Sequence, residues 1–149
     1  MKNNILIPRN IEGRQEKLKQ KWYKMFTTQE VIDGNIDIKM DLDIDPSLVK
    51  TKKINGNVYL RNITKIPQFF KNIEINGFFD CSHNKLTSLR GCPEIVHGNF
   101  SCSDNNLTSL EGCPKEVKGN FWCDHNSKQF TVEEVKQYCK VDGKINTRT

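Results

Sequence analysis

Apolar residues recur along the chain with a period of about 21 residues between positions 32 and 143. A glycine marks each copy of the pattern, and a β-branched residue stands two positions before it. The glycines are Gly34, Gly56, Gly77, Gly98, Gly119 and Gly143, and the β-branched residues are Ile32, Ile54, Ile75, Val96, Val117 and Val141. Self-similarity at a fixed period of this size indicates a repeat architecture. We therefore expect one core shared by stacked copies, because a single copy cannot bury its own apolar side.

The three central copies share a finer pattern that predicts a strand. Counted from the glycine, the third residue is aromatic, the fifth is cysteine and the eighth is asparagine. These positions hold Phe79, Phe100 and Phe121, then Cys81, Cys102 and Cys123, then Asn84, Asn105 and Asn126. Apolar residues at every second position are typical of a strand with one buried face. We predict strands near residues 57–61, 78–82, 99–103 and 120–124, paired in parallel with the three phenylalanines stacked inside.

The remainder of each copy returns the chain to the start of the next one. The asparagine favours a turn because its side chain bonds neighbouring backbone groups. Two leucines follow, Leu86 and Leu89 in one copy, and the next segment, Gly-Cys-Pro, is incompatible with a regular helix. The first two copies depart from this pattern: the Gly56 copy has Phe69-Phe70 on its return, and the Gly34 copy lacks the asparagine. The sequence therefore leaves their register open.

The segment Phe-x-Cys-x-x-Asn-x-Leu-x-x-Leu of residues 79–89 resembles the consensus of leucine-rich repeats, with Phe and Cys in two of the usual leucine positions. The short period, Leu-Thr-Ser-Leu and the proline on the return are similar to the bacterial-effector class of these repeats and to small phage-encoded proteins. The resemblance is specific over residues 77–126 and weaker over 32–76. It implies a leucine-rich-repeat solenoid of about five coils with one short parallel β-sheet. The ubiquitin-ligase domain of the effector family has no counterpart in this sequence.

Both ends of the repeats carry patterns of cap helices. Leu18, Trp22 and then Met25 or Phe26 have helical spacing, which predicts a helix over residues 12–26. Residues 27–30, Thr-Thr-Gln-Glu, fit a capping box and predict a second short helical turn. Residues 131–134, Thr-Val-Glu-Glu, predict the start of a C-terminal helix whose apolar stripe is Val132, Val135 and Cys139 or Tyr138. The organisation expected is a basic N-terminal cap region (1–31), leucine-rich repeats (32–126) and a C-terminal cap helix with a tail (127–149).

Charge and composition narrow the function classes. The chain has 149 residues and a formal net charge of +5, most of which lies in residues 1–30. No apolar run is long enough for a membrane span, and the first residues lack the pattern of a secretory signal. We therefore expect a cytoplasmic protein, in the host cell if a phage encodes it. The abundance of Lys, Asn and Ile with no Ala fits an A/T-rich coding genome of the kind many phages have.

The cysteines and histidines are interpreted as structural residues. Five of the six cysteines lie in repeat columns, which favours packing over disulfides or a metal site, and Cys-x-x-Cys does not occur. His83 and His125 share one column, with Asp104 between them. Because the two histidines are two strands apart, we expect them to be about 10 Å from each other, which is too far for both to bind one metal ion. With Asp124, these residues are the only catalytic candidates worth testing. We expect no enzyme, no cofactor and no metal.

A repeat scaffold without a catalytic constellation is typical of a protein-binding module. If the third and fifth positions point inward, the second, fourth and sixth lie on the concave face. The partner-binding residues predicted there are Tyr59, Arg61, Phe78, Asp80, Ser101, Trp122 and Asp124, because aromatic and Arg residues dominate binding hot spots. The leading hypothesis is a phage-encoded factor that binds, and inhibits, a host bacterial protein. The alternatives are a structural virion component, or a nucleic-acid-associated protein that uses the basic residues 1–30 with Trp22 and Tyr23.

Overall fold

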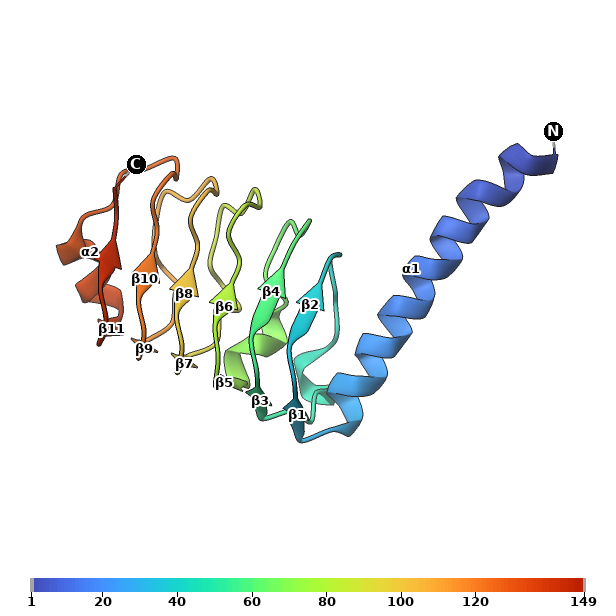
Figure 1. Cartoon of the computed structure of the whole chain (residues 1–149), viewed down its shortest axis with the longest axis horizontal. Helices are drawn as coiled ribbons and strands as arrows, with labels where there is room; N and C mark the ends of the chain where they lie inside the picture. The colour runs from blue at the N-terminus through green and yellow to red at the C-terminus, as the bar shows by residue number, and fades with distance from the viewer. Residues whose placement is uncertain (1, 149) are drawn as a thin grey trace.

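Strands from successive copies build two parallel sheets in the computed structural model, which describes the backbone of residues 2–148 and the side chains of residues 13–148. Among the described residues each sheet has six strands (Figure 1). The first sheet consists of β1 (Val31–Asp33), β3 (Lys53–Asn55), β5 (Glu74–Ile75), β7 (Ile95–Val96), β9 (Glu116–Val117) and β11 (Lys140–Val141). The second consists of β2 (Ile36–Ile38), β4 (Val58–Leu60), β6 (Phe79–Asp80), β8 (Phe100–Ser101), β10 (Phe121–Trp122) and β12 (Ile145–Asn146). Each copy supplies one strand to each sheet, and this arrangement is compatible with a repeat solenoid.

The strands predicted for the central copies are confirmed in the second sheet. The strands β4, β6, β8 and β10 fall within the four predicted ranges and pair in parallel. Phe79, Phe100 and Phe121 lie directly opposite one another in the register and are completely buried. Their ring centroids are 6.2 Å and 4.9 Å apart, which makes a continuous aromatic column in the core.

The structure corrects the expectation of a single short sheet of about five coils. The β-branched column forms the first sheet, in which Ile54 pairs with Ile75 and Ile75 with Val96. The glycine that follows each of these residues lets the chain bend between its two strands. Residues 140–146, which sequence analysis places in the C-terminal cap and tail, supply the sixth strand of both sheets.

The register of the first two copies, which the sequence leaves open, follows that of the others. Ile36 pairs with Val58 and Ile38 with Leu60, and all four side chains are buried. The irregular returns are absorbed by short 3₁₀ helices at Pro46–Leu48 and Gln68–Asn72. The second of these buries both Phe69 and Phe70, whereas Ile63 and Ile66 take the place of the paired leucines of the later copies.

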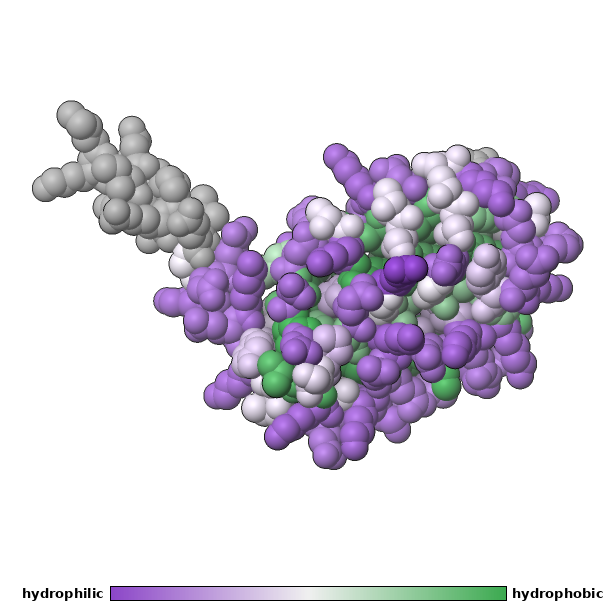
Figure 2. All heavy atoms as spheres, turned by 180° about the vertical axis from the view of Figure 1, so that it is seen from behind, coloured by the Kyte–Doolittle hydropathy of each residue, from purple (hydrophilic) through white to green (hydrophobic). Residues whose placement is uncertain are grey.

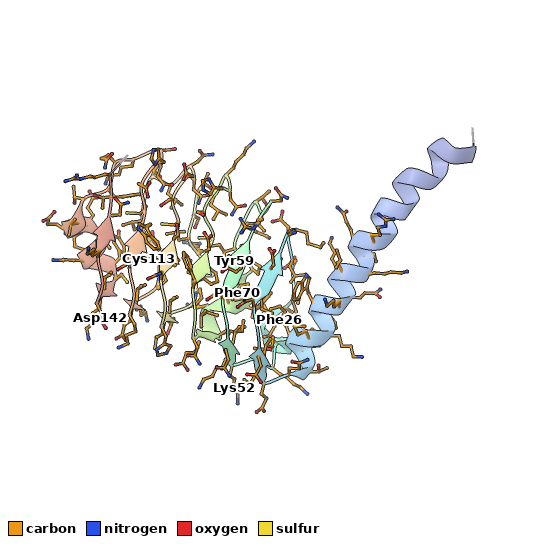
Figure 3. The ribbon with its side chains drawn as sticks, in the orientation of Figure 1. Phe26, Lys52, Tyr59, Phe70, Cys113 and Asp142 are labelled. Carbon is orange, nitrogen blue, oxygen red and sulfur yellow. The ribbon has the colours of Figure 1, made fainter. Side chains whose placement is uncertain are left out.

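The N-terminal helix is longer than predicted and is anchored by its last turns. The helix α1 spans Lys2–Thr28, and Trp22 and Phe26 bury their side chains against the first copies. The Phe26 ring lies 4.7 Å from that of Phe69, and Figure 3 shows Phe26 beside Phe70. The Phe26 carbonyl, left free at the helix end, accepts hydrogen bonds from the backbone of Lys50 and Thr51. None of the helices in the described residues has the length and apolarity of a membrane span.

One capping box is confirmed and the other is wrong. The hydroxyl of Thr131 accepts a hydrogen bond from the backbone of Glu134 and starts α2 (Val132–Tyr138), as predicted. Val135 and Cys139 form its buried side, whereas Tyr138 is exposed. The predicted turn at residues 27–30 does not form, because Thr28 still belongs to α1 and β1 begins at Val31. The hydroxyls of Thr27 and Thr28 instead donate back to carbonyls of the preceding helical turn.

The repeated glycine is required because consecutive copies touch backbone to backbone at this position. The Gly98 N–H donates to the Gly77 carbonyl at 3.1 Å, and Gly119 donates to Gly98 at 3.0 Å. A Cβ atom added to Gly98 would lie 2.6 Å from the carbonyl carbon and oxygen of Gly77. Contacts this short are not tolerated, so any side chain at this position forces two copies apart.

The repeated asparagine forms a hydrogen-bonded ladder on the inside of the turns. The Asn105 side chain donates to the carbonyls of Cys81, Cys102 and Ser103 at 3.0 to 3.2 Å. Its Oδ1 accepts the backbone N–H of Leu86 at 3.0 Å. Corresponding bonds are made by Asn84 and Asn126. One side chain thus satisfies buried backbone groups of its own copy and of the preceding one.

Gly98→Ala is expected to destabilise the protein by about 1–3 kcal/mol, as overpacking of a tight contact does. Gly13→Ala is the matched control, because Gly13 lies in α1 with nothing within 4 Å of an added Cβ. In an exposed helix the added methyl is expected to stabilise by about 0.5–1 kcal/mol. Chemical denaturation of both variants measures the difference, and equal stabilities would contradict the backbone contact.

Asn105→Asp is expected to destabilise the protein by about 2 kcal/mol or more, although the side chains have the same shape. The substitution removes the N–H donors and places a carboxylate oxygen against three carbonyl oxygens, each of which loses one of its hydrogen bonds. Asn106→Asp is the control because Asn106 is exposed. If thermal melting shifts equally for the two variants, the ladder does not carry the stability assigned to it.

Candidate protein-binding surface

The fourth residue of each copy lies on the outward face of the second sheet. The register aligns Asp37, Tyr59, Asp80, Ser101, Trp122 and Asn146 in one row across the six strands. Of the seven predicted contact residues, four therefore lie in this row. Arg61 and Asp124 follow it two residues later in their copies, and Phe78 comes two residues before Asp80.

Three aromatic rings from different copies meet on this face, and we call Tyr59, Phe78 and Trp122 the aromatic strip. The Phe78 ring lies 6.4 Å from that of Tyr59 and is stacked on Trp122 at 5.7 Å with an angle of 25°. All three rings are partly exposed. Ser101, which lies between Asp80 and Trp122 in the register, is only 7 % exposed. The structure thus places three predicted residues in one patch and buries a fourth.

The second position of each copy is mostly structural, which corrects the view that it lies free on the surface. The side-chain oxygens of Asn57, Asn99 and Asn120 accept the backbone N–H of the corresponding residue in the next copy, each at 2.8 Å. Phe78 occupies this position in its copy and makes no such bond through its side chain. In this column, asparagine indicates a residue that bonds the next copy. An aromatic residue at the same position is the sequence signal for a side chain available to a partner.

Arg61 is engaged within the same face. Its guanidinium lies 5.6 Å from the centre of the Tyr59 ring and 3.8 Å from the carboxylate of Asp37. Both side chains of this ion pair are about half exposed, so the pair contributes little to stability. Arg61 extends the aromatic strip toward the N-terminal copies and shows that a guanidinium fits against these rings.

Three carboxylates lie beside the aromatic strip, and we call Asp80, Asp104 and Asp124 the carboxylate cluster. Asp80 accepts hydrogen bonds from the backbone and hydroxyl of Ser82. Asp104 lies 3.6 Å from His83, and Asp124 is bonded to the Ser103 hydroxyl and to His125, the latter at 2.7 Å. Partial burial raises the pKa of Asp124, but the bonds from Ser103 and His125 outweigh this and hold the pKa below its ordinary value. Asp124 is therefore ionised at neutral pH.

The residue types of the histidine column fit the backbone conformation that the column adopts. Asn62, His83, Asp104 and His125 all adopt left-handed backbone conformations, with φ between 52° and 56°. Asn, Asp and His are the side chains that tolerate this conformation best. The Ser103 hydroxyl donates to a carboxylate and not to an imidazole, so this arrangement does not activate it as a nucleophile. No group of three or more potential ligands for a metal ion is found among the described residues.

The outward face of the first sheet differs because its charges are paired. Glu116 is bonded to Lys118 and lies 3.9 Å from Lys140, and Glu74 pairs with His97. Polar side chains of neighbouring strands also bond one another, as Asn76 does with Asn55. Seen from behind, the molecule is mostly hydrophilic, with apolar atoms visible between the polar side chains (Figure 2). The clustered rings, and carboxylates that pair with neither a lysine nor an arginine, are features of the second sheet.

A cleft lies beside the C-terminal half of α1. It has a volume of about 350 Å³ and is lined by Tyr23, Leu42 and Ile44 with charged residues of both signs around them. Trp22 does not line it, because its ring is buried near Phe26 at a centroid distance of 6.3 Å. This removes Trp22 from the residues that could stack on a nucleic-acid base.

The six cysteines are free thiols and all are buried, as the packing interpretation predicts. Burial raises the pKa of Cys123 and of Cys139 to about 12. Burial likewise raises the pKa of Cys92, Cys102 and Cys113 well above the ordinary value. These thiols therefore remain protonated at neutral pH and cannot act as nucleophiles.

Comparison with known proteins finds no matching family model, no matching curated protein and no matching solved structure. The function must therefore be argued from the geometry of this chain.

The buried thiols predict slow thiol chemistry and alkaline instability. The native protein should react slowly with a disulfide reagent near about pH 8, and six thiols should react after unfolding. The free energy of unfolding is not reduced by thiol ionisation below the ordinary thiol pKa of about 8.5, because the thiols are then protonated in both the folded and the unfolded chain. Above this pKa the unfolded chain loses protons first. Each of the five thiols with a raised pKa then lowers the free energy of unfolding by up to about 1.4 kcal/mol per pH unit until its folded pKa is reached. Denaturation midpoints under reducing conditions at about pH 8 and 10 test this, and equal values would contradict it.

Proposed function

We propose that this chain is a non-enzymatic protein-binding module, built as a leucine-rich-repeat solenoid, that holds a protein partner on the outward face of its second sheet. This face corresponds to the concave face expected from the sequence. The observation that carries the proposal is the aromatic strip. Tyr59, Phe78 and Trp122 interrupt columns that elsewhere hold small or polar residues, and their rings meet across copies.

The energetic argument rests on the cost of leaving these rings in water. Among the residues of the second-sheet strands, the third and fifth positions supply the side chains of the core, and these are buried without help from the strip. Partly exposed aromatic rings contribute little to folding, yet such rings are the commonest binding hot spots, at about 2 kcal/mol or more each. The strip is thus better explained by a partner than by the fold.

Two further parts of the proposal rest on sequence resemblance alone. The resemblance to small phage-encoded repeat proteins suggests that the partner is a host bacterial protein and that binding inhibits it. A structural role in the virion would use the same surface, and counting copies of the chain in purified particles distinguishes the two.

A basic helix face supports nucleic acid as a second candidate partner. Arg14, Lys17, Lys21 and Lys24 recur at helical spacing on α1, and all four are exposed. Such a stripe fits phosphate groups. Because Trp22 is buried, the contact would be electrostatic, and a salt-sensitive shift of a nucleic-acid duplex that Lys17→Gln with Lys21→Gln weakens would support it.

Trp122→Ala and Tyr59→Ala are each expected to weaken partner binding at least about tenfold, or about 1.4 kcal/mol, with little change in melting temperature. The partner is first captured from an extract of the native host with the parent protein, and binding of each variant to the purified partner is then measured. Ile95→Ala is the matched control, because Ile95 is an apolar residue 36 % exposed on the other sheet. Parent-like binding by both aromatic variants would remove this face as the contact site.

A further inference from the structure

The charge beside the aromatic strip is opposite to that of the chain as a whole. The protein carries a net charge of +5, yet the carboxylate cluster places three negative charges on adjacent strands and turns of one face. Ionised carboxylates that pair with neither a lysine nor an arginine keep an outward negative field.

The partners of the cluster are hydroxyls, backbone N–H groups and histidines. Within residues 13–148, no ion pair joins Asp80 or Asp124 to a lysine or arginine, and Asp104 is paired only with His83. Arg61 lies on the same face but pairs with Asp37, and Arg148, which follows β12, forms no ion pair with the cluster. The Asp104 side chain is 39 % exposed, so its carboxylate remains accessible to a ligand.

Most carboxylates of the first sheet, in contrast, have cationic partners, although Asp33 instead accepts a hydrogen bond from the amide of Asn55. Lys115 lies 3.5 Å from Glu94, and Lys118 lies 3.9 Å from Asp142 as well as against Glu116. Among the described residues, lysines thus pair with Glu94, Glu116 and Asp142 on the first sheet. On the second sheet Asp37 pairs with Lys39 and Arg61, whereas the carboxylate cluster pairs with neither a lysine nor an arginine.

The rings beside the cluster favour one type of cation. A guanidinium is planar, stacks on aromatic faces and bonds carboxylates through paired N–H groups, whereas an ammonium ion is a strongly hydrated point charge. Arg61 already shows this contact with Tyr59 at the N-terminal end of the strip. Trp122 and Asp124 belong to the same copy and offer a ring and a carboxylate two residues apart.

We propose that the segment of the partner bound on this face is cationic and presents arginine side chains that stack on the aromatic strip and pair with the carboxylate cluster. This inference rests on the proposed function and names the chemistry of the partner. Acidic segments and nucleic acids are repelled from the same face.

The test uses the full chain with Trp22→Phe, so that Trp122 is the only tryptophan, and titrates it with hexa-arginine, hexa-lysine and hexa-glutamate peptides. Hexa-arginine should change the Trp122 fluorescence saturably and bind more tightly than hexa-lysine, and hexa-glutamate should leave the signal unchanged. Raising the salt concentration should weaken binding because exposed charges are screened. A response to hexa-glutamate as strong as that to hexa-arginine would overturn the proposal.

Asp104→Asn is the decisive variant, because asparagine tolerates the left-handed backbone that this position requires. Asp104→Asn combined with Asp124→Asn should raise the dissociation constant for hexa-arginine at least about fivefold. Asp33→Asn combined with Asp142→Asn removes the same charge from exposed positions of the first sheet, and should leave the dissociation constant unchanged. Equal effects of the two pairs would mean that only net charge matters, and would refute a specific site. Melting curves show whether each double variant is folded. If the variant with both Asp104→Asn and Asp124→Asn is unfolded, the dissociation constant of Asp104→Asn alone is measured instead.

The outcomes separate this inference from the proposed function. If Trp122→Ala loses the protein partner while hexa-arginine fails to bind, the face binds a partner of different chemistry. If hexa-arginine binds as described while Trp122→Ala retains the protein partner, the cationic site exists but is not the contact proposed for that protein.

Discussion

The close contact between the backbones of successive copies is the constraint on which the rest of the structure depends. Gly77, Gly98 and Gly119 stack with their peptide groups hydrogen-bonded in a line, at N–O distances of 3.0 to 3.1 Å. This contact leaves no room for a Cβ atom. It brings every copy into the same relation to its neighbours, so that equivalent residues lie about one strand spacing, or about 4.8 Å, apart. Each column of the sequence therefore becomes a row in space.

Stacking at this spacing decides which side chains each column can hold. A buried column must fill space with the same group again and again, as the phenylalanines and cysteines do without leaving polar atoms unpaired. A buried polar side chain must form hydrogen bonds with backbone groups of its own copy and of the preceding copy. Asparagine can do this because its amide both donates and accepts. The turn after the strand needs a left-handed residue, which explains why Asn, His and Asp share one column. The recurrence of His and Asp in this column therefore follows from backbone geometry.

Sequence periodicity was sufficient to predict the features that repeat. The strand positions, the inward phenylalanines and the buried cysteines follow from alternation within one copy and recurrence between copies. The first sheet was missed, although Ile54, Ile75 and Val96 had been recognised as a column, because strands of two or three residues give too little alternation to identify. The full length of α1 was also missed, because Pro8 lies within it and proline is disfavoured in the interior of a helix. Contacts between columns, such as Phe78 with Trp122, cannot be read from one copy, because the two residues occupy different positions in copies two strands apart.

The deviations from the repeat carry the functional argument. Residues that the stacking requires are the same in each copy, so a position that varies while its neighbours do not is free of that requirement. Tyr59, Phe78 and Trp122 stand at such positions, and the register brings them together on one face. The carboxylates beside them lack the lysines that neutralise the opposite sheet. A scaffold that fixes the spacing of each row and leaves one face free to vary can present a binding surface without altering its core.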